Sequence, residues 1–112
     1  MGGQPRHDLI PNAALHEVAV VLGFGGDKHS PWGWKNVADI RGTYTGKALR
    51  HLGSYLARGA LDKESGRHHV AHAIADLFFV LENDIGPGPQ RPTSGESPPP
   101  RALSLDDQMD NS

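Results

Sequence analysis

The sequence contains no cysteine, and this absence excludes three kinds of chemistry at once. Disulfide bridges, thiolate zinc sites and cysteine nucleophiles all need a sulfhydryl group. Any metal or nucleophile chemistry must therefore use other side chains.

Long apolar runs and a strong charge imbalance are also missing. The longest apolar runs, residues 18–22 and 77–81, are far shorter than the ~20 residues that span a bilayer. Eleven Lys and Arg residues stand against 13 Asp and Glu residues, and no basic stripe of the kind that binds nucleic acid is present. No signal peptide is evident, so we expect a cytoplasmic protein that binds neither nucleic acid nor membrane.

Aromatic residues make up only 6% of the chain, and none follows Ile85, where six of the nine prolines lie. A proline-rich segment without aromatic residues cannot bury enough apolar surface to fold. We expect a disordered N-terminus over residues 1–7, a folded domain over 8–84 and a disordered tail over 85–112. Because so small a domain has a thin core when alone, we also expect a homo-oligomer, either a dimer or a tetramer.

Apolar periodicity and helix-boundary signals predict three main helices and hence an all-α fold. The predicted helices cover residues 12–23, about 43–59 and about 65–83, and strand patterns are nearly absent. Residues 23–36, which are rich in glycine and include a proline, are predicted to form an irregular functional loop.

The last predicted helix carries two stripes of side chains. The main apolar stripe comprises Val70, Ile74, Leu77, Phe78 and Leu81. A second stripe, about 120° away, comprises His69, His72, Ala73, Asp76 and Val80. We therefore expect this helix to be buried on more than one side.

The densest group of reactive side chains lies between positions 62 and 76. His69 and His72 are three residues apart on one helical face, Asp76 follows one turn later, and Asp62 and Glu64 precede them. Imidazoles and carboxylates in this arrangement offer direct and supporting ligands for a divalent metal. The structural alternative is that Asp62 or Ser65 caps the helix and that Glu64 favours its positive end.

Two further groups of residues are candidates for a site. His51 lies beside Arg50 in the apolar stripe of the second predicted helix, where core packing alone would account for it. The glycine-rich loop contributes cations, an aromatic ring and an amide that suit phosphate contacts and base stacking: Lys28, Trp34, Lys35 and Asn36. Trp34 equally suits a place in a small core.

Four motifs, in order, resemble one protein family. They are Asp8-Leu9-Ile10-Pro11…Ala14-Leu15, Gly25-x-x-Lys28…Trp34, Leu49-Arg50-His51-Leu52 and Asp62-x-Glu64-Ser65-Gly66-x-x-His69-x-x-His72-Ala73. Together they resemble a family of small phage and prophage proteins described as the dATP/dGTP diphosphohydrolase N-terminal domain. That family is thought to be related to the MazG-like all-α nucleotide pyrophosphohydrolases, and the resemblance covers nearly all of residues 8–84.

The resemblance implies an enzyme that converts a purine deoxynucleoside triphosphate, dGTP or dATP, to the monophosphate and pyrophosphate. It implies Mg²⁺, or Mn²⁺, as the cofactor and a phage- or prophage-encoded role in remodelling the nucleotide pool of a bacterial host. On this reading the metal ligands are Asp62, Glu64 and Asp76. The substrate-binding residues are Lys28, Trp34, Lys35, Asn36 and Arg50. His51, His69 and His72 orient the attacking water or move a proton.

The chain departs from MazG-like enzymes where those enzymes bind metal. It has no Glu-x-x-Glu pair in the second predicted helix, and His69-x-x-His72 stands where Glu-x-x-Asp is expected. Two other functions therefore stay open. One is a non-enzymatic phage accessory protein that uses the histidine-rich face for partner contacts, and the other is an HD-like metal phosphohydrolase with histidines as primary ligands.

Overall fold

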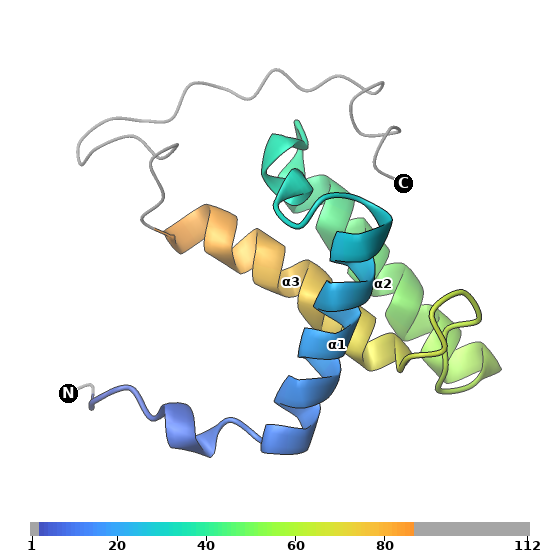
Figure 1. Ribbon diagram of the computed structural model, residues 1–112, viewed down its shortest axis with the longest axis horizontal. Coiled ribbons are helices and arrows are strands. Elements are labelled where there is room, and N and C mark those ends of the chain that lie inside the picture. Colours follow the sequence, from blue (N-terminus) through green and yellow to red (C-terminus); the bar gives the residue numbers. More distant parts are fainter. Residues whose placement is uncertain (1–2, 87–112) are drawn as a thin grey trace.

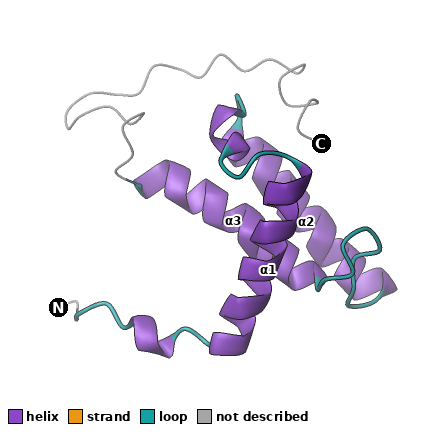
Figure 2. Cartoon of the chain, in the orientation of Figure 1, coloured by secondary structure: helices purple, strands orange, loops and turns teal. Residues whose placement is uncertain are grey.

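Three long helices make up most of the computed structural model, which describes residues 3–86 (Figure 1). They are α1 (Asn12–Lys28), α2 (Ile40–Arg58) and α3 (His69–Ile85), and two short 3-10 helices accompany them, η1 (His7–Leu9) and η2 (Gly33–Asn36). The described residues contain no strand beyond an isolated bridge between Leu61 and His68, which confirms the all-α prediction (Figure 2). The predicted tail lies outside the described residues apart from its first two, Ile85 and Gly86. No described helix is long and apolar enough to cross a membrane.

Helix α3 is the element on which the other two long helices pack. It contacts α2 along much of its length, and α1 crosses it (Figure 1). At the crossing, Val18 and Val21 of α1 meet Ala71 and Ala75 of α3 in one buried cluster. Because alanine side chains are small, the two helix backbones approach each other closely at this interface.

The predicted end of the first helix, at residue 23, is wrong. Helix α1 continues through three glycines to Lys28 and ends where the His29 N–H donates to the Gly25 carbonyl (2.9 Å). Glycine disfavours helix by about 0.5–1 kcal/mol relative to alanine, but tertiary contacts outweigh this cost. One such contact is Phe24, which packs edge-on against His72 with ring centroids 6.4 Å apart.

The rest of the predicted loop leads into η2, which inserts Trp34 into a second core cluster. This cluster contains Trp34, Val37, Ile40 and Tyr44, with Phe79 and Val80 of α3 packed against it. The indole of Trp34 stacks on Phe79 at 4.9 Å, and Tyr44 meets the same ring edge-on at 5.0 Å. Of the two placements considered for Trp34, the core placement is the one found.

Helix α2 begins at Ile40, three residues before its predicted start, because Asp39 caps it. The Asp39 side chain accepts a hydrogen bond from the Gly42 N–H (3.0 Å). A Cβ atom at position 42 would lie 2.2 Å from Asp39 Oδ2, so alanine there would push the capping side chain aside. At the other end, Gly59 follows the helix with a φ of 128°, a conformation that favours glycine.

Helix α3 begins at His69, four residues after its predicted start. The preceding residues form a tight turn in which the Asp62 N–H donates to the Arg67 carbonyl and the Gly66 N–H to the Asp62 carbonyl, both at 2.8 Å. His68 is the cap, since its Nδ1 accepts from the Val70 N–H (3.0 Å). The alternative that Asp62 or Ser65 caps this helix is therefore wrong, because both residues are held within the turn.

The prediction that the apolar stripe is the main buried face of α3 is also wrong for the C-terminal part of the stripe. Leu77, Phe78 and Leu81 are 43%, 44% and 54% exposed. The buried residues of α3 lie on two faces that flank this stripe: Ala71 and Ala75 meet α1, whereas His69 and Ala73 belong to the predicted second stripe, so the helix is buried on more than one side as expected. The smaller side chains face α1 and α2 because only they fit at the close crossing, and the oligomer that would cover the larger ones stays a prediction.

Candidate functional site

A cleft of about 1220 Å³ opens between the C-terminal half of α1, the segment around η2, the middle of α2, the turn that follows α2, and α3 as far as Glu82. Nearly all the residues predicted for a site line it: Lys28, Trp34, Lys35, Arg50, His51, Asp62, Glu64, His69, His72 and Asp76. Asn36 is exposed and does not line the cleft. The structure thus gathers residues from every part of the predicted domain at one place.

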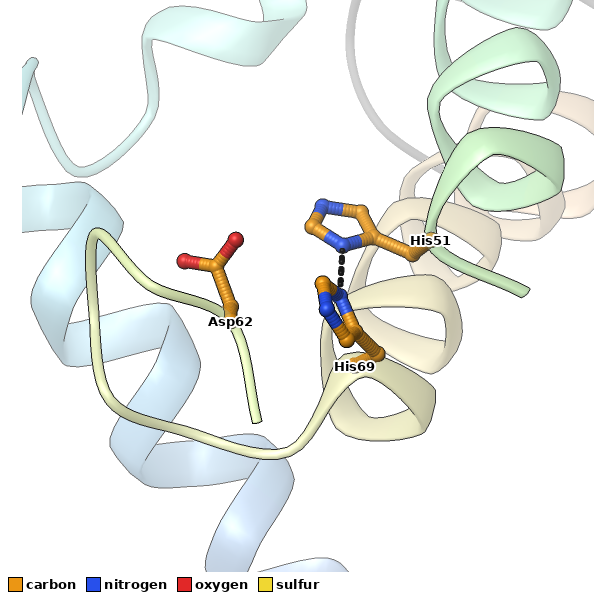
Figure 3. Close-up of side chains that lie close together, drawn as sticks. All are labelled: His51, Asp62 and His69. Atoms are coloured by element: carbon orange, nitrogen blue, oxygen red, sulfur yellow. Dashed lines mark hydrogen bonds between the residues drawn. The ribbon is translucent and has the colours of Figure 1, made fainter. Parts of the chain in front are cut away.

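Two histidines and an aspartate form the tightest group in this cleft (Figure 3). His51 comes from α2, His69 is the first residue of α3, and Asp62 lies in the turn between these helices. The Nδ1 atoms of His51 and His69 are 3.0 Å apart and share a hydrogen bond. One ligand atom from each of the three residues lies within 4.8 Å of the others, and no other group of this kind occurs among the described residues.

The Asp62 carboxylate is held in place by Ser65. The Ser65 N–H and hydroxyl both donate to Asp62 Oδ2, at 2.9 and 3.0 Å. Burial alone would raise the pKa of Asp62, but these hydrogen bonds and the neighbouring His72 and His51 outweigh it, so the pKa is lowered. Asp62 is therefore a fixed carboxylate that carries its negative charge at neutral pH.

His72 supports this group from the next turn of α3. Its ring stacks on His51 with centroids 4.5 Å apart and an interplanar angle of 9°. Its Nε2 lies 2.7 Å from the Ser65 hydroxyl and 3.8 Å from Asp62 Oδ2. Burial lowers the pKa of both His51 and His72, so both imidazoles are neutral at neutral pH and have a lone pair available.

Helix α1 fixes the turn that presents Asp62. The Arg67 guanidinium donates twice to Glu17 of α1, at 3.0 and 2.6 Å, and these bonds lower the pKa of the Glu17 carboxyl. The His68 N–H also donates to Glu17, at 3.3 Å. Near the end of α1, Lys28 pairs with Glu64. Glu64, one of the three predicted metal ligands, therefore already has a cationic partner and stands outside the histidine–aspartate group.

Asp76, another predicted metal ligand, lies on α3 two turns after His69 and in a different environment. Its Oδ2 is buried without a hydrogen-bond partner. Burial raises the pKa of Asp76 to about 7, although the nearby charges of Lys47 and Arg50 act in the opposite direction. The three predicted carboxylates are thus not brought into one cluster, because only Asp62 joins the two imidazoles.

The second tryptophan of the loop is better placed for a ligand than the predicted one. Trp34 is 8% exposed and one face of its indole is covered by Phe79, whereas Trp32 is 67% exposed at the same cleft. Lys35 lies over both rings, 5.0 Å from the Trp32 centroid and 5.9 Å from that of Trp34. The structure therefore favours Trp32 over Trp34 as a surface on which a planar ligand stacks.

Sequence reasoning missed Trp32, Ser65 and Lys47. Lys47 precedes Arg50 and His51 by three and four residues, the spacing that puts side chains on one helical face. Its place beside them in the cleft could therefore have been predicted from the sequence. Ser65 was considered only as a helix cap. Nothing in the sequence distinguishes Trp32 from Trp34, because which ring enters the core depends on how η2 packs.

One protein family matches the chain. The family described as "dATP/dGTP diphosphohydrolase, N-terminal" matches residues 1–89, which include all the described residues. No curated protein and no solved structure matches the chain.

Proposed function

The chain belongs to the dATP/dGTP diphosphohydrolase N-terminal family, and on that premise we propose that it hydrolyses a purine deoxynucleoside triphosphate to the monophosphate and pyrophosphate. We place this activity in the remodelling of a bacterial host's nucleotide pool by a phage or prophage. The family's description names the diphosphohydrolase activity, and the chemistry of the cleft supports it.

The observation that carries the proposal is the pairing of cations and proton-transfer groups in one cleft. Lys28, Lys35, Lys47 and Arg50 line it together with Asp62, Asp76, His51, His69 and His72. A triphosphate needs several cationic partners to offset its charge, and its hydrolysis needs a group that takes a proton from water. Both kinds of group are present within reach of one bound molecule.

Within this cleft each group has a role that follows from its surroundings. The exposed Trp32 ring, with Lys35 above it, suits stacking on a purine base. Lys47 and Arg50, on one face of α2, suit contacts with phosphate oxygens. Asp76 faces these two cations, and its pKa of about 7 suits a group that accepts a proton at neutral pH.

Magnesium would enter this cleft with the nucleotide. Mg²⁺ prefers oxygen ligands and is usually held by one or two carboxylates together with substrate phosphates. Glu64 and Asp76 supply such carboxylates along the cleft wall, and the buried, unpartnered Asp76 Oδ2 is the oxygen that most needs a cation or proton. A bound divalent cation would offset phosphate charge and lower the pKa of a water molecule.

The test is a panel of the eight common NTPs and dNTPs, each with Mg²⁺ or Mn²⁺, in which pyrophosphate and phosphate release are measured separately. We expect pyrophosphate and the monophosphate from dGTP or dATP. Release of phosphate without pyrophosphate contradicts this chemistry and favours the HD-like phosphohydrolase. No turnover of any nucleotide favours the accessory protein.

A matched pair of lysine variants checks that turnover arises in this cleft. Lys47→Met removes a cation from the cleft wall, whereas Lys63→Met removes an exposed lysine that does not line it. We expect Lys47→Met to lower kcat/KM at least tenfold and Lys63→Met to leave it unchanged. Equal losses in both variants would place the activity elsewhere.

A further inference from the structure

The group formed by His51, Asp62 and His69 does not fit the cation that the proposed reaction uses. Two of its three ligand atoms are imidazole nitrogens, and magnesium is a hard cation that takes oxygen ligands in octahedral geometry. Imidazole together with one carboxylate is a donor set for zinc and similar transition metals. We propose that these three residues form a binding site for one resident transition-metal ion, with Zn²⁺ as its prototype, separate from the magnesium of the nucleotide.

The spacing of the donors supports a single ion. A tetrahedral zinc ion with bonds of about 2.0–2.1 Å holds its ligand atoms roughly 3.3 Å apart. The facing Nδ1 atoms of His51 and His69 are already 3.0 Å apart, and the three donors all lie within 4.8 Å of one another. A single ion is therefore within reach of all three donors.

The residues around the donors are arranged as they are around metal sites. A metal-binding carboxylate or imidazole is usually oriented by a second hydrogen-bond partner. Ser65 gives Asp62 two such hydrogen bonds, and the ring of His72 covers one face of His51. The turn itself is closed by the His69 N–H, which donates to the Ala60 carbonyl at 2.7 Å.

The donors come from three separate parts of the fold. Asp62 lies in the turn, His51 in the middle of α2 and His69 at the start of α3, and all three side chains face one space (Figure 3). An ion there would join α2, the turn and α3, so its binding should raise the thermal midpoint of the folded chain. This proposal does not involve the nucleotide and is tested without it.

The test uses the full chain, stripped with a chelator, dialysed against ZnCl₂ and analysed for bound metal. We expect one zinc ion per chain, a higher thermal midpoint, and no such shift with MgCl₂ at the same concentration. With CoCl₂ we expect the intense visible absorption of a tetrahedral Co²⁺ site. Binding of less than one zinc ion per chain at saturation, or an equal shift with magnesium, overturns the proposal.

Three variants and two controls assign the ligands. Asp62→Asn keeps the size of the side chain and an oxygen that can accept from Ser65, while His51→Ala and His69→Ala each remove an imidazole. We expect each to weaken zinc binding at least tenfold. His16→Ala and Asp27→Asn, which change exposed residues of α1, should bind zinc as the wild type does.

Circular dichroism of the metal-free variants separates loss of a ligand from loss of folding. Asp62→Asn is expected to unfold near the wild-type temperature yet to lose the zinc-induced shift. Zinc affinity in Asp62→Asn equal to that of the wild type overturns the assignment. The metal analysis contains no nucleotide, so its failure leaves the hydrolase proposal standing, and loss of the hydrolase proposal leaves the zinc result unaffected.

Discussion

Asp76 has one carboxylate oxygen buried without a hydrogen-bond partner, and burial raises its pKa from 3.8 to about 7. Between these two values the folded chain keeps a proton on Asp76 that the unfolded chain has released. The contribution of this residue to the free energy of unfolding therefore falls as the pH rises from about 4 to about 7. Above that range the fold carries a buried charge that its surroundings disfavour.

Replacing this residue tests the sign of the effect. Asp76→Asn is expected to raise the free energy of unfolding by roughly 2–4 kcal/mol at pH 8, because a pKa shift of one unit corresponds to about 1.4 kcal/mol. At pH 4 the variant and the wild type should differ little, since both side chains are then largely neutral in the folded state. Urea unfolding at the two pH values measures this difference in stability. Asp27→Asn, at an exposed position of α1, is the control. A difference that does not change with pH would contradict the assigned pKa.

The two tryptophans of the loop should respond in opposite ways to truncation. Trp34→Ala removes a stacked core ring and is expected to cost about 3–5 kcal/mol of stability. Trp32→Ala removes an exposed ring, so its stability should stay within about 0.5 kcal/mol of the wild type while KM for the nucleotide rises. Chemical unfolding and steady-state kinetics give the two readouts. A stable Trp34→Ala protein would show that the second core cluster is loosely packed.

At the scale of single elements, the start of α2 depends on two residues acting together. Gly42→Ala would bring a Cβ atom to 2.2 Å from Asp39 Oδ2 and force the capping side chain away. Asp39→Ala removes the cap directly, at a cost of about 1 kcal/mol. In the Asp39→Ala background, however, Gly42→Ala should stabilise the helix by roughly 0.5–1 kcal/mol, because alanine is the better helix former.

A double-mutant cycle on these two positions, measured by thermal or urea unfolding, reveals the coupling. We expect the two single substitutions to destabilise the protein and the second substitution to reverse sign in the presence of the first. Strict additivity would mean that the two residues are not coupled, so that alanine at position 42 does not displace the Asp39 cap.

The existence of all three helices was predictable from the sequence, but their ends were not. Periodic apolar residues mark each helix because they depend only on the 3.6-residue repeat. The ends depend on local hydrogen bonds, and the sequence offered competing choices for them. Asp39 gave α2 an earlier start, His68 gave α3 a later one, and contacts of Phe24 carried α1 past its first glycine.

The residues of the candidate site were predictable singly, whereas their grouping was not. His51 and His69 are 18 positions apart on different helices, and they meet only because α2 packs along α3. In the same packing, Glu64 forms an ion pair with Lys28, and Asp76 lies near the charges of Lys47 and Arg50. Neither carboxylate joins the group that contains Asp62. Residue type and spacing identify reactive side chains, but which of them share a ligand is decided by how helices pack.

At the scale of the whole molecule, large apolar side chains lie exposed on the outer face of α3. Leu77, Phe78 and Leu81 are between 43% and 54% exposed, and Leu49 and Leu56 of α2 are 63% and 83% exposed. We expect sedimentation at micromolar concentration to give at least a dimer that covers such faces. Phe78→Glu with Leu81→Glu should shift the protein toward monomer, because each places a charge where an apolar contact is expected.

Leu9→Glu, which changes a leucine of η1 that is 66% exposed, is the control for added charge. It should leave the sedimentation coefficient unchanged. A wild-type monomer at every accessible concentration would contradict the oligomer expected from the small core.

Helix α1 has a further property that follows from its contacts with α3 and with the turn before it. It is synthesised before α3, and the partners that hold it come much later in the chain: Glu17 meets Arg67, 50 positions downstream, and Val18 meets Ala71. An isolated helix of this length is only marginally stable in water. On the ribosome, therefore, α1 lacks these partners until α3 has emerged from the exit tunnel, and it reaches its native place only after the helix that is made later.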